Sequence, residues 1–324
     1  MTGIGDTKVN WILDADIRSF FDMVSQEWLV RFVEHRVGDR RIIRLIQKWL
    51  KAGILENEVV TVSERGTGQG SVVSPLLANI YLHYAFDLWA NRWRQQEATS
   101  DMIVVRYAHD IVAGFEHEAD AHRFLEMMRT RLEEFALTLH PEKTRLIEFG
   151  RRAVVWREKR GLGKPETFSF LGFTLICGKS RRGKFLLWRK SRRDRLQAKL
   201  LAVKEEMRRR MHQPIPQPEE WLRQVVTGYF AYHAVPTNIR AHQSFRDCVV
   251  RLWRRSLRRR GQRDKTTWER IDRLTEDFLP SRASFIPGLS NASPSNTQGG
   301  SRMRECRSYG SVARACNNAR PYRD

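Results

Sequence analysis

The chain has 324 residues, 41% of them hydrophobic, which is enough to build a buried core and excludes a wholly disordered protein. A formal net charge of +21 sets it apart from ordinary cytosolic enzymes and favours a polyanionic partner, nucleic acid first. The sequence holds no run of about 20 apolar residues and no basic start before an apolar run. We therefore expect no membrane span, no signal peptide and a cytoplasmic location.

The charge is unevenly distributed along the chain. Residues 1–150 hold 18 Lys and Arg against 22 Asp and Glu, whereas residues 151–324 hold 40 against 15. The first half thus gathers acidic groups, and the second half is typical of a surface that binds polyanions. The four cysteines lack the close spacing of a zinc site, and we interpret them as free thiols in a reducing compartment.

The pattern of the first half predicts an α+β unit up to about residue 178. The apolar run of Trp11, Ile12 and Leu13 predicts a buried strand that ends at Asp14 to Asp16. Apolar residues at three-to-four spacing predict a helix over 27–53, with an interruption near Gly38. The later elements expected are a strand at 59–62, a glycine-rich loop at 64–75, a helix at 76–93, a hairpin at 102–115, a helix at 118–136, a strand pair at 137–149, a charged loop at 151–166 and short strands at 167–176 and 184–188.

The second half predicts helices and then a tail. A helix with one apolar stripe is expected over 191–211, followed by a proline-rich break at 212–220. Two more helices are expected near 219–231 and 238–260. The serine-, glycine- and arginine-rich residues 281–324 predict a disordered basic tail. The domains expected are therefore 1–178, 179–280 and the tail 281–324.

Two acidic residues in the first half are candidates for metal binding. Asp16 ends an apolar strand, Asp110 lies in the turn of an apolar hairpin, and the loop Gly66 to Gly70 lies between them in the sequence. Carboxylates at strand edges suit a hard cation such as Mg²⁺, which takes oxygen ligands from rigid backbone. The alternative is that both are ordinary turn aspartates.

Five segments occur in an order that narrows this choice: WILDADIRSFFD, GTGQGSVVSPLLANIYL, VVRYAHDIVAGF, ALTLHPEKTRLIEFG and FSFLGF. Together they resemble the reverse-transcriptase motifs of group II intron-encoded reverse transcriptase/maturases, over most of residues 8–178. RLWRRSLRRR and TWERIDRL resemble the maturase or thumb region of that family, to about residue 280. The resemblance implies a right-hand polymerase palm, an antiparallel sheet with helices, followed by an α-helical thumb/maturase region.

The resemblance also implies roles for single residues. Asp16 falls on the metal-binding aspartate of the first catalytic motif. Phe21 falls on the aromatic residue under the sugar of the incoming nucleotide, where a planar side chain would exclude a 2′-hydroxyl; the alternative is a core phenylalanine. Lys143 falls on a lysine that could act as general acid to the pyrophosphate; the alternative is a solvated turn lysine.

Two loops complete the site that the resemblance implies. The glycine-rich loop lets backbone approach the template, the primer and the incoming dNTP. Its matching residues are Gly66 for primer and template, and Gln69 and Gly70 for the dNTP. A strand turn that grips the primer matches Phe170, Leu171 and Gly172.

The chain departs from the family where the hairpin turns. The family reads Tyr-Ala-Asp-Asp, and this chain reads Tyr107-Ala108-His109-Asp110. His109 thus replaces the aspartate that the resemblance places on both metal ions with Asp16, and imidazole is a poor Mg²⁺ ligand. The resemblance implies two Mg²⁺ ions, and we expect His109 to weaken their binding. We expect the rate of catalysis to fall roughly a hundredfold or more as a result. The alternative gives His109 a new role as ligand or proton donor.

Other departures concern loops and missing segments. Gly68 stands where the family usually has proline, which loosens the loop. Full-length members carry a fingers region before the first catalytic motif, and this chain starts about eight residues before it. No Cys/His cluster of an endonuclease follows the thumb. These departures suggest a fragment of a split or decayed reading frame.

Arginines in the second half are candidates for RNA contact. They recur at three- and four-residue steps, which places them on one helix face while Leu252, Trp253 and Leu257 can face the core. The row consists of Arg251, Arg254, Arg255, Arg258 and Arg259. Guanidinium groups suit phosphates, whereas the alternative is a solvated helix kept soluble by charge. The aromatic residues expected to stack on bases are Trp221, Tyr229 and Tyr232.

The sequence therefore predicts an RNA-directed DNA polymerase with intron RNA binding and impaired activity. Asp16 and Asp110 hold the metal, and Lys143 and His109 complete the catalytic set. The expected partners are group II intron RNA and a DNA primer or target, with no membrane; no oligomeric state is assigned. One alternative is a catalytically inactive maturase that stabilises intron RNA, and another is a basic nucleic-acid binder without specificity.

Overall fold

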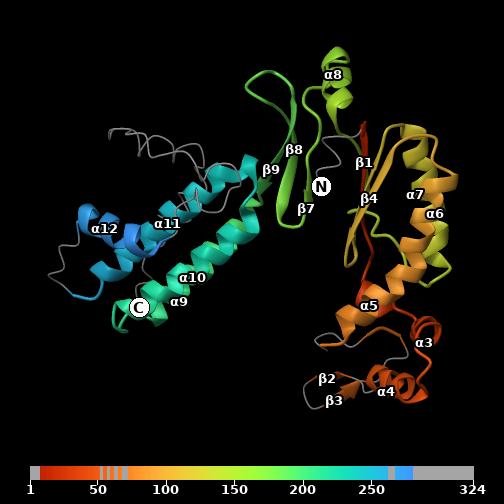
Figure 1. The fold of residues 1–324 in the computed structure, drawn as a ribbon, viewed down its shortest axis with the longest axis horizontal. Helices are drawn as coiled ribbons and strands as arrows, with labels where there is room; N and C mark the ends of the chain where they lie inside the picture. Colours follow the sequence, from red (N-terminus) through yellow and green to blue (C-terminus); the bar gives the residue numbers. More distant parts are fainter. Residues whose placement is uncertain are drawn as a thin grey trace. The chain divides into compact units, whose positions relative to one another are not determined.

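The computed structural model describes residues 8–51, 54–56, 59–61, 65–67, 72–261 and 267–279. It divides into two compact units. The first unit consists of Met1–Phe170 and Ile176–Leu187, coloured red to green in Figure 1. The second unit consists of Leu171–Leu175 and Trp188–Asp324, coloured green to blue. The first unit mixes helices with an antiparallel sheet, and this confirms the predicted α+β class.

A four-stranded antiparallel sheet forms the centre of the first unit, in the order β4-β5-β1-β6. The strands are β1 (Trp11–Asp16), β4 (Met102–Tyr107), β5 (Asp110–Phe115) and β6 (Arg145–Glu148). Apolar residues of β1 and β5 build the core, and Ile12, Leu13 and Ile111 are fully buried. β1 ends at Asp16, within the predicted end of Asp14 to Asp16, and its pairing with β5 extends to that residue.

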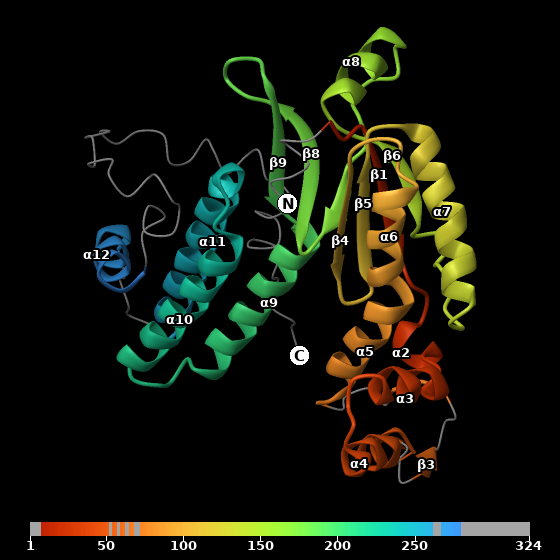
Figure 2. The ribbon, with the colours of Figure 1, turned by 45° about the vertical axis from the view of Figure 1, so that its right-hand side comes forward.

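Helices lie beside this sheet, and Figure 2 shows α6 and α7 next to its strands. They are α2 (Phe20–Met23), α3 (Gln26–Glu34), α4 (Arg40–Lys51), α5 (Ser74–Leu82), the π-helical segment η1 (His83–Asp87), α6 (Leu88–Gln96) and α7 (Glu118–Glu133). The break between α3 and α4 falls around Gly38, as predicted. The expected helices at 76–93 and 118–136 are confirmed as α5 to α6 and α7.

Two local predictions in this unit are wrong. Residues 137–149 give a single strand, β6, which pairs with β1; ahead of it only an isolated bridge joins Leu139 to Ile17. The predicted loop 151–166 begins with the helix α8 (Arg151–Lys159). The breakers Gly161, Gly163 and Pro165 all come after this helix, so they end it rather than prevent it.

Two smaller sheets are also present. β2 (Ile54–Glu56) pairs with β3 (Val59–Thr61), which confirms the strand at 59–62 and adds one that the pattern did not reveal. The strands β7 (Phe168–Phe170), β8 (Phe173–Lys179) and β9 (Phe185–Ser191) form a three-stranded sheet, in the region where short strands were predicted at 167–176 and 184–188. Residues 64 and 68–71 of the predicted loop 64–75 lie outside the described residues.

The second unit is helical. Its elements are α9 (Arg193–Arg209), α10 (Pro216–His233), the 3-10 turn η2 (Pro236–Asn238), α11 (Ile239–Arg258) and α12 (Trp268–Phe278). The predicted stripe of α9 packs on α10 and α11 around the buried Phe245 and Trp253. No helix in the described ranges is long and apolar enough to cross a membrane. The predicted tail lies outside those ranges.

Candidate active site

Asp16 and Asp110 lie directly opposite each other. Asp16 is the last residue of β1, Asp110 is the first residue of β5, and their Cα atoms are register partners. Residues opposite each other in an antiparallel pair project to the same face, and like charges in that position repel. The pair therefore requires nearby positive charge. The structure brings together the two carboxylates that the sequence named.

His109 joins this pair. It belongs to the two-residue turn between β4 and β5, where Ala108 has φ 50°. Ligand atoms of Asp16, His109 and Asp110 all lie within 4.8 Å of one another, and His109 Nε2 is 3.9 Å from Asp16 Oδ1. The imidazole ring packs against Phe20 and Phe21, with ring centroids 6.4 and 6.1 Å away. The turn thus presents a nitrogen donor beside two carboxylates.

Lys143 supplies a positive charge to the pair. Its Nζ donates a hydrogen bond to Asp16 Oδ2 at 2.8 Å. The segment after α7 runs beside the end of β1, where the His140 amide donates to the Asp16 carbonyl at 2.8 Å, and this places Lys143. The Asp16 carboxylate raises the pKa of the Lys143 amine. Lys143 is therefore brought to the site as an ion-pair partner of Asp16.

Asp14 is a member of this acidic face that sequence reasoning missed. It precedes Asp16 by two residues in a strand, so it projects to the same side of the sheet. Burial raises the pKa of the Asp14 carboxyl above its ordinary value; the hydrogen-bonded Arg145 opposes this rise, and the charges of Asp110 and Asp16 add to it. The period-two rule applied to β1 could have found it.

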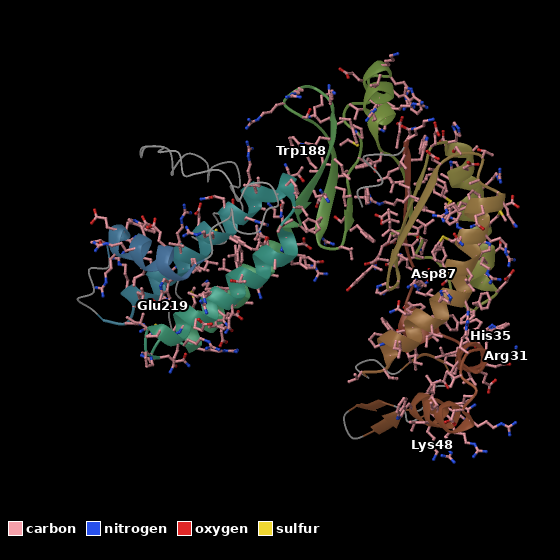
Figure 3. The ribbon with its side chains drawn as sticks, in the orientation of Figure 1. Arg31, His35, Lys48, Asp87, Trp188 and Glu219 are labelled. Atoms are coloured by element: carbon pink, nitrogen blue, oxygen red, sulfur yellow. The ribbon has the colours of Figure 1, made fainter. Side chains whose placement is uncertain are left out.

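Arg106 was also missed, and it supports the turn. Its guanidinium donates two hydrogen bonds of 2.6 Å to the carboxylate of Asp87, which lies in η1 and is labelled in Figure 3. It also donates to the Ala108 carbonyl and to Asn79 Oδ1, both at 3.0 Å. The Arg106 side chain is only 13% exposed. One guanidinium thus ties the turn that carries His109 to α5 and η1.

Phe21 and Gly66 are neighbours. The backbone at Gly66 and Thr67 hydrogen-bonds to Val24 and Phe21, with Thr67 N 2.8 Å from the Phe21 carbonyl oxygen. Gly66 has φ 86°, and a Cβ there would lie 2.8 Å from the same oxygen, so only glycine fits. Gln69 and Gly70 lie outside the described residues.

The residues predicted to grip the primer form the turn between β7 and β8. Phe170 is buried, and Leu171 and Gly172 have φ 48° and 73°. The hydroxyl of Tyr232 donates to the Leu171 carbonyl at 3.1 Å. Their contact with a primer stays a prediction.

The arginine row lies on α11 and at its C-terminal end. Leu252, Trp253 and Leu257 are buried, as predicted. The arginines have distinct surroundings: the Arg254 guanidinium lies 4.1 Å from the centre of the Trp268 ring. Arg255 and Arg259 belong instead to a groove between α9 and α11. That groove is lined by Lys204, Met207, Arg208, Met211, Leu252, Arg255, Ser256 and Arg259.

The groove therefore combines four cationic side chains with an apolar floor, and Arg251 and Arg258 are not among its lining residues. The predicted stacking role of Tyr229 is wrong, because its ring is buried against Phe245 at 3.8 Å between centroids. Tyr232 is exposed. The Arg210 guanidinium lies 5.1 Å from the centre of the Trp221 ring.

A comparison with protein families identifies the first unit. Residues 5–175 match the family model described as "Reverse transcriptase (RNA-dependent DNA polymerase)", which is more than half of the chain. The chain belongs to the reverse transcriptase family. The family expected from the motif order is confirmed, and the four-stranded sheet with its helices is the palm of a right-hand polymerase fold.

Curated relatives of this chain include proteins encoded by introns. It is 29% identical to Protein YkfC of Escherichia coli over 215 residues, which are 56% of this chain and 51% of YkfC. It is 42% identical to the group II intron-encoded protein LtrA of Lactococcus lactis over 73 residues, 22% of this chain and 12% of LtrA. The chain thus spans about half of YkfC and a much smaller share of LtrA.

A solved structure similar to this chain is a telomerase from Candida albicans in complex with a fragment of telomeric RNA. The likeness has a TM-score of 0.47 at 12% identity and covers 82% of this chain and 42% of the telomerase.

Membership of the reverse transcriptase family implies the use of a divalent metal ion. Asp16 and Asp110 offer the oxygen donors that a hard cation takes. His109 adds a nitrogen donor where the resemblance places an anionic oxygen, and imidazole binds Mg²⁺ poorly. The donor set therefore fits one divalent cation and does not fit a pair of Mg²⁺ ions.

Proposed function

We propose that this reverse transcriptase acts with intron RNA, as a palm joined to a basic helical region, and that His109 reduces its RNA-directed DNA synthesis. The observation that carries the proposal is the pairing of Asp16 with Asp110 at one edge of the palm sheet, with His109 between β4 and β5. The similarity to LtrA supports an intron RNA as partner. Under this proposal residues 8–178 act as the palm and residues 179–280 as the thumb/maturase region, in the cytoplasm.

Each residue has a defined task in this proposal. Asp16 and Asp110 would hold a divalent cation, which in nucleotidyl transfer activates the primer 3′-hydroxyl and offsets the charge on the leaving pyrophosphate. Phe21 would lie under the deoxyribose, on a backbone fixed by its hydrogen bond from Thr67. Lys143 holds Asp16 in place through the 2.8 Å ion pair.

Replacement of an aspartate by His109 removes one negatively charged ligand from the catalytic site. With His109 in the turn, two carboxylates remain to offset the charge of the metal ions that polymerisation requires. The loss of one such electrostatic group costs roughly a hundredfold or more in rate. The RNA-binding half is untouched by this change, so RNA binding and DNA synthesis are separable.

Primer extension on an RNA template with dNTPs and Mg²⁺ tests the polymerase. We expect His109→Asp to extend the primer at least roughly a hundredfold faster than wild type, because it restores the missing carboxylate. His122→Asp is the matched control: it makes the same change on the exposed face of α7 and leaves the rate unchanged. Asp16→Asn in the His109→Asp background should abolish extension. A His109→Asp protein that folds by circular dichroism but extends no faster than wild type contradicts the proposal.

A second candidate is a catalytically silent maturase that stabilises intron RNA. The groove of four cations between α9 and α11 favours it, because arginines bind phosphate oxygens in pairs. Filter binding separates the cases: a maturase retains group II intron RNA over random RNA of equal length at raised salt, where backbone attraction weakens. Equal retention of both RNAs would leave only a general basic binder.

A further inference from the structure

His109 is oriented toward the acidic pair and has little else to bind. Its Nε2 faces Asp16 Oδ1 at 3.9 Å, and Phe20 and Phe21 pack against the ring. The other ring nitrogen, Nδ1, is buried and has no hydrogen-bond partner among the described residues. The ring's lone pair is therefore not committed to another group of the described chain. Its place beside two carboxylates is a ligand position.

The charge around His109 is incompletely balanced. Lys143 pairs with Asp16 and Arg145 with Asp14, at 2.8 and 3.4 Å. Within the described ranges, the Asp110 carboxylate makes neither a hydrogen bond nor an ion pair. Like charges directly opposite each other in a sheet are destabilising, and a cation close to both carboxylates relieves this repulsion. The cluster of Asp16, His109 and Asp110 thus retains negative charge after Lys143 is counted.

The donor types decide which cation fits best. Two carboxylate oxygens and one imidazole nitrogen form a mixed set, which ions such as Mn²⁺, Co²⁺ and Zn²⁺ accept readily. Mg²⁺ prefers oxygen ligands in near-ideal octahedral geometry and gains little from imidazole. Exchanging an aspartate for histidine at this turn therefore weakens the Mg²⁺ site and strengthens a site for transition-metal ions.

We propose that Asp16, His109 and Asp110 form a site for one divalent transition-metal ion, which they bind in preference to Mg²⁺. The inference rests on the proposed function only in placing the metal in the same pocket; it concerns which ion binds, not whether DNA is made. His109 is the residue that sets the preference, and Asp16 and Asp110 provide most of the charge.

Binding of Co²⁺ to the metal-free full-length chain tests this directly, since a Co²⁺ ion with a nitrogen ligand has a visible absorption that free Co²⁺ lacks at the same strength. We expect one Co²⁺ per chain, with Mg²⁺ displacing it only at roughly tenfold or greater excess. His109→Asp should weaken Co²⁺ binding and strengthen Mg²⁺ binding, so that the selectivity falls by roughly tenfold or more. Asp16→Asn should abolish both.

Two further proteins complete the test. His122→Ala, at an exposed His–Glu pair of α7, is the matched control and should bind Co²⁺ like wild type. His109→Gln keeps a polar side chain at the turn and should lose the absorption while the fold is retained. The inference is overturned if His109→Asp keeps the wild-type preference, if Mg²⁺ competes equally in wild type, or if His122→Ala removes binding. None of these readouts uses a primer or an RNA, so they fail or succeed independently of polymerisation.

Discussion

Lys143 Nζ lies 2.8 Å from Asp16 Oδ2, while Oδ1 of the same carboxylate faces His109 Nε2 at 3.9 Å. One carboxylate is thus shared between a cation of the chain and a position suited to a metal ligand. The resemblance suggested that Lys143 donates a proton to pyrophosphate. Its geometry gives it a second effect, because a metal ion at Asp16 must share the carboxylate with the ammonium group.

Lys143→Gln should therefore bind divalent cations more tightly than wild type. Removing a positive charge next to Asp16 reduces repulsion of the incoming ion, and we expect the affinity for Mn²⁺ to rise roughly threefold to tenfold in calorimetric titrations. Lys164→Gln removes an equal charge from an exposed position before β7 and should leave the affinity unchanged. If Lys143→Gln binds Mn²⁺ no better than wild type, the ammonium group does not compete for Asp16.

Arg106 should be the most sensitive support of the turn. Arg106→Gln leaves the Asp87 carboxylate without its paired donors, and we expect a loss of about 1–3 kcal/mol in the free energy of unfolding by urea. Arg106→Lys keeps the positive charge but cannot donate two parallel hydrogen bonds, so it should recover only part of the lost free energy of unfolding. Arg129→Gln, which breaks an exposed pair with Glu126, should stay within about 0.5 kcal/mol of wild type. Equal effects at both arginines would contradict a supporting role for Arg106.

Gly66→Ala should disturb the backbone under Phe21. The new Cβ would meet the Phe21 carbonyl oxygen at 2.8 Å, in addition to the strain of φ 86°. Gly161→Ala provides a matched control, because it has φ 68° but nothing within 4 Å of the added Cβ. We expect Gly66→Ala to lower the melting temperature clearly more than Gly161→Ala. Equal shifts would show that only the backbone conformation matters.

The groove between α9 and α11 should contribute to RNA binding through its charge. Arg255→Gln combined with Arg259→Gln removes two of its four cations, and we expect the RNA affinity to fall and the slope of log affinity against log salt to decrease by roughly one to two. Arg223→Gln, whose guanidinium pairs with Glu220 on α10, is the control for lost charge. An unchanged slope in the double variant would remove the groove from the RNA interface.

The helical unit should lose stability in mild acid. Burial lowers the pKa of His233 and of His242 below the ordinary value of 6.5. The unfolded chain therefore binds more protons than the folded one between the folded pKa and 6.5, and stability falls as the pH drops through that window. Melting curves between about pH 8 and about pH 5 should show this loss, and His233→Gln should flatten it. The exposed His212, changed to Gln, should leave the pH dependence as it is.

The sequence predicted those parts of the molecule that depend on local pattern. Short apolar and β-branched runs located β1, β4 and β5. The motif order predicted that Asp16 and Asp110 share one site. Features that depend on distant partners escaped prediction. Arg106 contacts Asp87 and Asn79, which lie 19 and 27 residues away in the sequence, and nothing in its neighbours reveals either contact.

Burial was harder to predict than secondary structure. Tyr229 was expected to stack on bases, yet packing between α10 and α11 places its ring on Phe245. Asp14 shares a face with Asp16, but only the pairing of β1 with β5 and β6 shows that it is partly buried. Tertiary packing, not local propensity, decides both cases.

Anomalous diffraction from crystals soaked in Mn²⁺ tests the central claim most directly. We expect one anomalous peak in contact with the Asp16 and Asp110 carboxylates and with a ring nitrogen of His109, and we expect it to disappear in Asp16→Asn crystals. A well-ordered pocket without a peak, or carboxylates of Asp16 and Asp110 that point to separate surfaces, would contradict it.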